Sequence, residues 1–302
     1  MIMSSFAIIL NGLLLVVFAV DPLRCLRNIS SYLIINIALA DLVTGTAILI
    51  WTTQTWPWLS FLCEQIVFSS IWLGYTVSFL TITLLSCERF IAIKYIWSAN
   101  RIVTKQRTMY AIIIIWLISC SSFVLISPTY RQIYILSLST FFEFCVIVVV
   151  IFYVKLWRTR RSHSQQESAI AVRQEMKLTV VVFLLLVILV FTTLPLMFTY
   201  QIIILASLIC KTRFCLGKAL HSLPLQLFPV FAINFSLNPV IYAWRLPKYR
   251  RSFYLLCSML FQNITHVQRP NNSESRRYLR SNVALSQFTS GSSASIQISQ
   301  EV

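Results

Sequence analysis

Long apolar runs alternate with short polar gaps along most of this 302-residue chain. A helix needs about 20 consecutive apolar residues to cross the hydrocarbon core of a bilayer. Seven runs meet this length, so the pattern predicts an all-α membrane protein, a bundle of seven transmembrane helices. A β-barrel is excluded, because barrel strands alternate apolar and polar residues over about ten positions. The expected spans are residues 2–20, 32–52, 65–88, 109–128, 132–156, 177–206 and 219–244.

The composition supports an integral membrane protein. The chain is 58% hydrophobic and 11% charged, with a mean hydropathy of +0.77, which is too apolar for a soluble fold. A net charge of +16 would favour nucleic acid as the partner of a soluble protein, but here the basic residues fall in the gaps between apolar runs. We therefore expect no nucleic-acid partner. The first run is as long as a span and has no basic residue ahead of it, so we expect a helix and not a cleavable signal peptide.

The distribution of lysine and arginine predicts the orientation. The gaps after the first, third and fifth spans and the C-terminal tail, counted together with Lys155 and Lys177 at the adjoining span ends, hold 21 of the 25 lysines and arginines. The other gaps hold 4. Cytoplasmic loops carry the excess of positive charge in membrane proteins. We therefore expect an extracellular N-terminus and a cytosolic C-terminus.

Three charged residues are costly where they lie. Asp41 falls near the middle of the second expected span, where a carboxylate must be protonated, paired or bound to a cation. A functional role is the main hypothesis, and a structural role is the alternative. Glu88 and Arg89 end the third span and mark a membrane boundary.

Prolines interrupt the last two spans, and an amphipathic segment follows them. Pro195 and Pro239 each remove a backbone donor, so we expect bends there that act as helix pivots. Residues 248–257 suit an amphipathic helix on the inner leaflet, and Cys257 at its end is a candidate lipidation site. We thus expect a receptor-like helical domain over 1–257 and a disordered cytosolic tail over 258–302.

The predicted topology places three of the eight cysteines, Cys63, Cys210 and Cys215, on the extracellular side, where disulfides persist. Cys210 and Cys215 can bridge within one loop, which predicts a disulfide between them. Cys63 is then odd, because the loop between the fourth and fifth spans has no cysteine.

Taken in order, these motifs resemble the rhodopsin-like (class A) family of G-protein-coupled receptors over residues 5–257. The similarity rests on seven features that occur in the family's order: Leu39-Ala-Asp41-Leu, Trp56-x-Trp58 with Cys63, Glu88-Arg89-Phe90, Trp116, Tyr153, Pro195 and Asn238-Pro239-Val-Ile-Tyr242.

The resemblance implies a receptor of the plasma membrane. An extracellular agonist would shift the bundle toward a form that opens at its cytosolic mouth and admits a heterotrimeric G protein. Arg89 would be held by Glu88 and Glu175, and then freed to contact the G protein together with Tyr153 and Tyr242. Arrestin and membrane lipids would be further partners.

The resemblance also implies an allosteric sodium ion and no other cofactor. Asp41, Ser78, Asn234 and Asn238 supply oxygen ligands suited to a hard monovalent cation. In the family, such a set binds sodium in the inactive state.

The chain departs from the family in four places. Thr193 stands where helix 6 has a tryptophan, and Cys145 lies where helix 5 has a proline. The partner cysteine of the second outer loop is absent, and the interval from Cys63 to Arg89 is one residue longer. The short second loop and the third-loop cysteine pair loosely resemble the melanocortin, adenosine and lipid-receptor branch.

The ligand is not evident from the sequence. Ile71 stands where amine receptors of the family present an aspartate, so we expect no biogenic amine. The expected ligand pocket is mostly apolar or aromatic, which fits a lipophilic ligand, although ordinary helix packing explains it equally well. Its residues are Ile71, Trp72, Tyr75, Met197, Tyr200 and Phe228.

Two other functions compete with a signalling receptor. A seven-helix transporter would carry several charges along one path or an internal repeat, but only Asp41 and Glu143 lie inside spans away from their ends. A receptor-like protein without signalling activity would explain Thr193. We expect no enzyme, because the three histidines are scattered and suggest no metal or nucleophile site.

Overall fold

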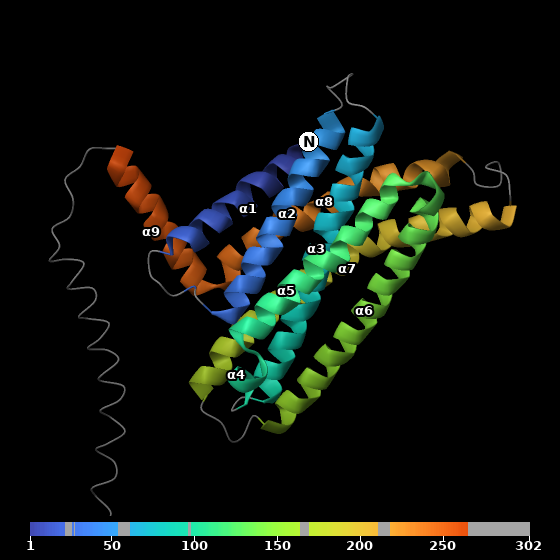
Figure 1. Cartoon of the computed structure of the whole chain (residues 1–302). Helices are drawn as coiled ribbons and strands as arrows, with labels where there is room; N and C mark the ends of the chain where they lie inside the picture. Colours follow the sequence, from blue (N-terminus) through green and yellow to red (C-terminus); the bar gives the residue numbers. More distant parts are fainter. Residues whose placement is uncertain are drawn as a thin grey trace, which may run out of the picture. The chain divides into compact units, whose positions relative to one another are not determined.

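The computed structural model describes residues 1–21, 26, 28–53, 61–95, 98–163, 169–210 and 218–264, all but a few of them helical (Figure 1). For residues 100, 156–163, 169–177, 210, 218–221, 248 and 259–264 the backbone alone is described. The elements are α1 (Ile2–Val20), α2 (Ile29–Thr53), α3 (Phe61–Lys94), α4 (Ala99–Ile102), α5 (Lys105–Ser119), the 3₁₀ helix η1 (Cys120–Ile126), α6 (Pro128–His163), α7 (Ala169–Cys210), α8 (Lys218–Arg245) and α9 (Pro247–Ile264).

The seven predicted spans are confirmed. Seven helical segments are long and apolar enough to cross a membrane, namely α1, α2, α3, α5 with η1, α6, α7 and α8. No strand occurs in the part of the chain that the structure describes. The main difference is the fourth gap, which we expected at residues 129–131. Pro128 already opens α6. A proline is well tolerated at this position, because the N–H that it lacks would have no partner in the first turn of a helix.

Hydrogen bonds from buried side chains tie α1 to α8. Asn11 Nδ2 donates to the backbone oxygen of Phe235 at 2.8 Å, and Ser236 Oγ donates to the backbone oxygen of Met3 at 2.9 Å. Lipid offers these groups no partner, so each bond joins neighbouring helices.

A small residue and an amide bring α2, α3 and α5 together. A Cβ atom on Gly74 of α3 would lie 2.7 Å from the backbone oxygen of Ala40, so the two helices touch at their backbones. Asn36 of α2 donates to Thr81 Oγ1 at 2.8 Å and accepts from Trp116 Nε1 at 2.9 Å. This amide therefore fixes three helices with one side chain.

The chain divides into two units, Met1–Tyr254 and Leu255–Val302, with the boundary inside α9. In the first unit, the ring of Tyr249 at the start of α9 lies 6.2 Å from that of Phe18 in α1. The predicted receptor domain and tail boundary remain predictions, since residues 265–302 lie outside the described part.

Candidate functional site

The carboxylate of Asp41 is fully buried in the middle of α2. Its Oδ2 accepts a hydrogen bond of 2.6 Å from Asn238 Nδ2 of α8. The Ser78 hydroxyl of α3 lies beside this carboxylate, although it makes no hydrogen bond of normal geometry within the described residues. Asn234 precedes Asn238 by one helical turn, and is therefore on the same face of α8.

The four side chains form a set of oxygen donors with unused capacity. Asp41 Oδ1, Ser78 Oγ, Asn234 Oδ1 and Asn238 Oδ1 are all buried and have no hydrogen-bond partner among the described residues. Buried polar groups normally find partners, so orphaned oxygens in one place need an explanation. Hard cations take oxygen ligands, and one carboxylate with neutral oxygens suits a single positive charge. The residues therefore fit the sodium ion that the sequence predicted.

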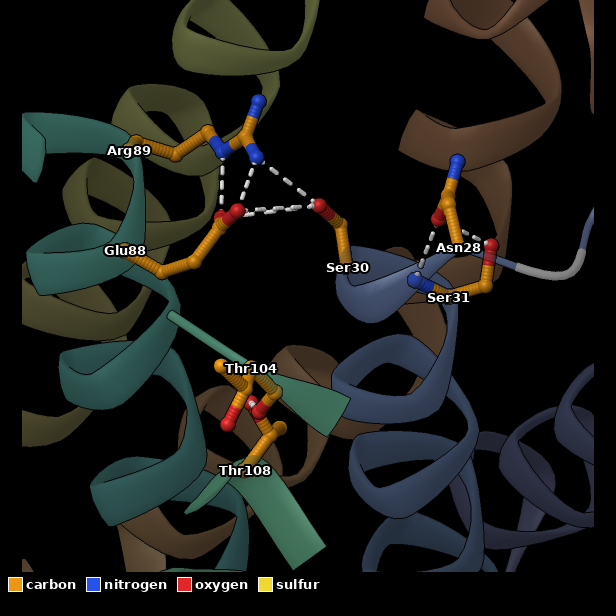
Figure 2. Close-up of polar contacts among 7 residues, drawn as sticks. All are labelled: Asn28, Ser30, Ser31, Glu88, Arg89, Thr104 and Thr108. Atoms are coloured by element: carbon orange, nitrogen blue, oxygen red, sulfur yellow. Dashed lines mark hydrogen bonds and ion pairs between the residues drawn. The ribbon is translucent and has the colours of Figure 1, made fainter. Parts of the chain in front are cut away.

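Glu88 and Arg89, at the far end of α3, form a buried ion pair (Figure 2). Arg89 Nε and Nη2 donate to the two carboxylate oxygens of Glu88. Ser30, in the first turn of α2, accepts a 2.9 Å hydrogen bond from Arg89 Nη2 and lies within 3.5 Å of both Glu88 oxygens. Glu88 is 7% exposed and Arg89 is 5% exposed. The charge pair is almost fully removed from solvent, and the hydrogen bonds of Ser30 help to replace the lost hydration.

The Arg89 cluster, defined as Ser30, Glu88 and Arg89, has a tyrosine nearby. The Tyr153 hydroxyl of α6 lies beside Ser86, close enough to Arg89 to interact electrostatically. Its ring is 5.5 Å from that of Phe183 in α7.

The other predicted switch residues are not joined to this cluster by a described contact. Tyr242 is buried in α8, and its hydroxyl has no hydrogen-bond partner among the described residues. Glu175 lies in α7, but its side chain is outside the described residues.

Four of the six predicted pocket residues are buried, and Tyr200 and Phe228 are partly exposed. Trp72 lies 6.0 Å from Tyr75 and 6.1 Å from Tyr200, measured between ring centroids. Phe228 joins the same layer through Phe231, at 5.7 Å. The structure thus brings the aromatic members of the predicted pocket into one layer that links α3, α7 and α8.

Several predicted features lie at or beyond the described residues. Cys210 ends α7 with an undescribed side chain, and Cys215 is outside the described part, so the predicted disulfide stays a prediction. Cys257 lies in α9, but the helix runs on to Ile264 and does not end at Cys257 as expected. Its lipidation stays a prediction. Pro195 and Pro239 lie inside α7 and α8.

The sequence reasoning missed three contributors. Ser30 completes the Arg89 cluster, and Trp51 and Phe68 extend the aromatic layer, with ring centroids 6.4 Å apart. The only available signal was their helical spacing relative to polar or aromatic neighbours, which does not say which helix they face.

The family model for seven-transmembrane receptors of the rhodopsin family matches residues 10–131, which run from α1 into α6. The match includes Asp41, Ser78, Glu88 and Arg89. Over these residues the chain is similar to this family. The predicted resemblance is thereby confirmed for this part of the chain.

Individual relatives are distant from this chain. The trissin receptor of Drosophila melanogaster is 30% identical over 113 residues, which cover 36% of this chain and 17% of that protein. The rat 5-hydroxytryptamine receptor 2B is 31% identical over 123 residues, covering 38% and 26%. Growth hormone secretagogue receptor type 1 of Mustela putorius furo is 24% identical over 305 residues, covering 84% and 78%. The first two matches span only 17% and 26% of those relatives' own lengths.

None of these three relatives is by name a melanocortin, adenosine or lipid receptor. The resemblance to that branch therefore stays a prediction.

Proposed function

We propose that this chain is a G-protein-coupled receptor of the plasma membrane. It binds an extracellular ligand and activates a heterotrimeric G protein at its cytosolic face, and arrestin and membrane lipids are its further partners. The N-terminus lies outside and the tail lies in the cytosol, as the lysine and arginine distribution favours. The ligand class is open, and Ile71 argues against a biogenic amine.

The Arg89 cluster is the observation that supports this proposal most. Arg89 is nearly buried and held by Glu88 and Ser30, and an ion pair of this kind is weak evidence for stability alone. Such an ion pair suits a conformational switch. If it forms in one of two conformations of the bundle and breaks in the other, it shifts the equilibrium toward the conformation in which it forms. The conformation described here, with Arg89 paired, is then the inactive one.

The test is G-protein activation in cells that express the chain. Basal and ligand-stimulated activation are measured at equal surface expression, with lipid, nucleoside and peptide libraries as ligands. Arg89→Ala abolishes activation, and Arg101→Ala, an exposed arginine of α4, is the matched control and leaves it intact. Activation that survives Arg89→Ala would overturn the role of Arg89.

A receptor-like protein without signalling activity is the second candidate, and Thr193 is the residue that favours it. Wild-type chain at the cell surface that activates no G protein under any ligand would support this alternative. The same result would overturn the first proposal.

A further inference from the structure

Glu143 lies near the middle of the membrane-spanning part of α6, which runs from Pro128 to Lys155. It is 15 residues from the first of these ends and 12 from the second. At about 1.5 Å per residue, each end is roughly 18–22 Å away. A carboxylate at such a depth has to be protonated, paired or bound to a cation. The proposed function uses Asp41 and Arg89 but gives Glu143 no role.

The helices around α6 offer this carboxyl group no cation. Glu143 Oε1 is buried and makes no hydrogen bond within the described part of the chain, although the residue as a whole is partly exposed. The spanning part of α7, Leu178–Ile209, has no charged residue. In α3 no lysine or arginine precedes Arg89, and η1 has none. In α6 the nearest is Arg131, three turns away and engaged by other contacts.

Glu143 borders the interface between α6 and α7. Gln201 Nε2 of α7 donates to Ser139 Oγ at 3.0 Å, and Ser139 lies one helical turn before Glu143 on the same face of α6. Farther along, the ring of Tyr153 in α6 lies 5.5 Å from that of Phe183 in α7. Residue numbers therefore rise along α6 as they fall along α7, so the two helices are antiparallel. The carboxyl group thus lies along this interface, about one turn from the Gln201 amide.

The interface at this depth combines hydrogen-bond acceptors with apolar side chains. The amide nitrogen of Gln201 is used for Ser139, which leaves its carbonyl oxygen as an acceptor. The Ser139 hydroxyl donates to the backbone oxygen of Leu136 at 3.0 Å, so it has no second proton to give. Phe198 of α7 and Ile147 of α6 lie one turn from the polar residue of their own helix, and both are exposed. A matching ligand has a charged donor group and an apolar body.

We propose that the α6–α7 interface is a binding site, open to the bilayer, for a single-chain amphiphile whose ammonium group pairs with Glu143. The ammonium group supplies the missing counter-charge and donates to Glu143 and to the carbonyl oxygen of Gln201. The apolar chain of the ligand lies along Phe198 and Ile147. Phospholipid headgroups do not fit, because they stay at the surface of a hydrocarbon core about 30 Å thick, roughly 15 Å from its middle.

This site is separate from the predicted ligand pocket. The argument from Ile71 against a biogenic amine concerns that pocket and not the α6–α7 interface. The site also does not rest on the proposed function, because it needs no G protein to form.

The test uses the purified full-length chain in phosphatidylcholine nanodiscs, with dodecylamine as the probe. Dodecanol has the same chain without the charge and is the matched ligand. Dodecylamine that carries a photoreactive diazirine locates the site, since labelled peptides are identified by mass spectrometry. Glu143→Gln removes the charge and keeps the shape of the side chain. Glu64→Gln, at an exposed position near the start of α3, is the control variant.

Dodecylamine is expected to raise the melting temperature of the wild-type chain by more than dodecanol does, because a ligand of the folded state stabilises it. In Glu143→Gln the dissociation constant of dodecylamine rises by about ten- to 150-fold, since a hydrogen-bonded charge pair is lost. Glu64→Gln keeps the wild-type affinity. The label is found on peptides of α6 and α7 in the wild-type chain and is lost from them in Glu143→Gln.

Four results would overturn the site. The first is an equal effect of dodecylamine and dodecanol, and the second is an equal affinity of wild type and Glu143→Gln for dodecylamine. A response that Asp41→Asn abolishes and Glu143→Gln keeps would place the amine at Asp41 instead. If dodecylamine does not bind and Glu143→Gln turns a dimer into a monomer by light scattering, the partner of Glu143 is a second copy of the chain. G-protein activation enters none of these measurements, so failure of the site and failure of the proposed function are distinguishable.

Discussion

Asn238 Nδ2 donates a hydrogen bond of 2.6 Å to the carboxylate of Asp41. The two residues are 197 positions apart in the sequence. The bond satisfies one carboxylate oxygen and leaves Oδ1 buried without a partner among the described residues. The side-chain oxygens of Ser78, Asn234 and Asn238 are likewise buried without a hydrogen-bond partner among the described residues. A ligand that binds here acts on α2, α3 and α8 at once.

We predict that sodium binds at Asp41 and stabilises the inactive form. Replacing sodium with a large organic cation should lower the melting temperature of the purified receptor, and agonist affinity should rise. At a sodium concentration 100-fold above its dissociation constant, the stabilisation is about 2.7 kcal/mol. Asp41→Asn keeps the shape of the side chain and removes the charge, so this variant should no longer respond to the exchange of cations. A wild-type receptor that ignores sodium would contradict the prediction.

Glu175→Ala should raise ligand-independent signalling. Glu175 lies 20 residues before Pro195 in the same helix, which at about 1.5 Å per residue places it roughly 30 Å away. This is the end of α7 that the predicted topology puts in the cytosol. A carboxylate there that pairs with Arg89 in the inactive form contributes about 1–3 kcal/mol of coupling, so its removal should favour the open form by about five- to 150-fold. Basal G-protein activation is compared at equal surface expression.

The alternative for Arg89 is that Glu88 and Ser30 alone hold it. An unchanged basal level in Glu175→Ala, in a receptor shown to couple, would favour this alternative. Ser30→Ala should then raise basal activation, because it removes one hydroxyl from the Arg89 cluster.

Gly74→Ala should destabilise the contact between α2 and α3. The added Cβ would meet the backbone oxygen of Ala40 at 2.7 Å, and backbone cannot yield as a flexible side chain can. Overpacking of this kind costs about 1–3 kcal/mol, which a lower melting temperature would reveal. Gly12→Ala is the matched control, since its Cβ would meet only Leu42 Cδ1, at 3.7 Å. Equal melting temperatures for the two variants would contradict the close approach of these helices.

The spans and the lone carboxylate could be predicted from the sequence because their physical signals are local. About 20 apolar residues identify a transmembrane helix wherever it packs, and Asp41 is conspicuous because a charge is expensive inside a bilayer. These predictions needed no knowledge of which helices are neighbours.

The contacts between helices could not be predicted in the same way. Ser30 meets Arg89 across 59 positions, and a serine near the start of a helix is equally well explained by local bonds to the backbone. The start of α6 at Pro128 was misjudged because a proline can either end one helix or open the next.

Cys210 and Cys215 should form a disulfide within one loop. Four intervening residues can turn back to the usual Cα separation of about 4.4–6.8 Å. Mass spectrometry of non-reduced peptides decides the pairing. A peptide that links Cys63, exposed at the start of α3, to either cysteine would contradict the prediction.

Arg131, near the start of α6, should hold this helix against α3 and η1 through non-covalent contacts. Its Nη2 donates to the side-chain oxygen of the buried Gln65, its Nε donates to the backbone oxygen of Leu125 at 3.1 Å, and its guanidinium lies 6.0 Å from the ring of Phe68. The connection between η1 and α6, which the predicted topology places outside, has no cysteine, so no disulfide can tie it to α3.

Removing the contacts of Arg131 should therefore lower the stability of the fold. Hydrogen bonds to a charged group contribute about 1.5–3 kcal/mol, so Arg131→Leu and Gln65→Leu should each lower the melting temperature. The double variant should lose little more than Arg131→Leu, because the two residues share one contact. Glu64→Gln, a change at the exposed neighbour of Gln65, is the control and should leave stability unchanged. If the two single losses add, Arg131 and Gln65 stabilise the chain independently, and the start of α3 is held by other contacts.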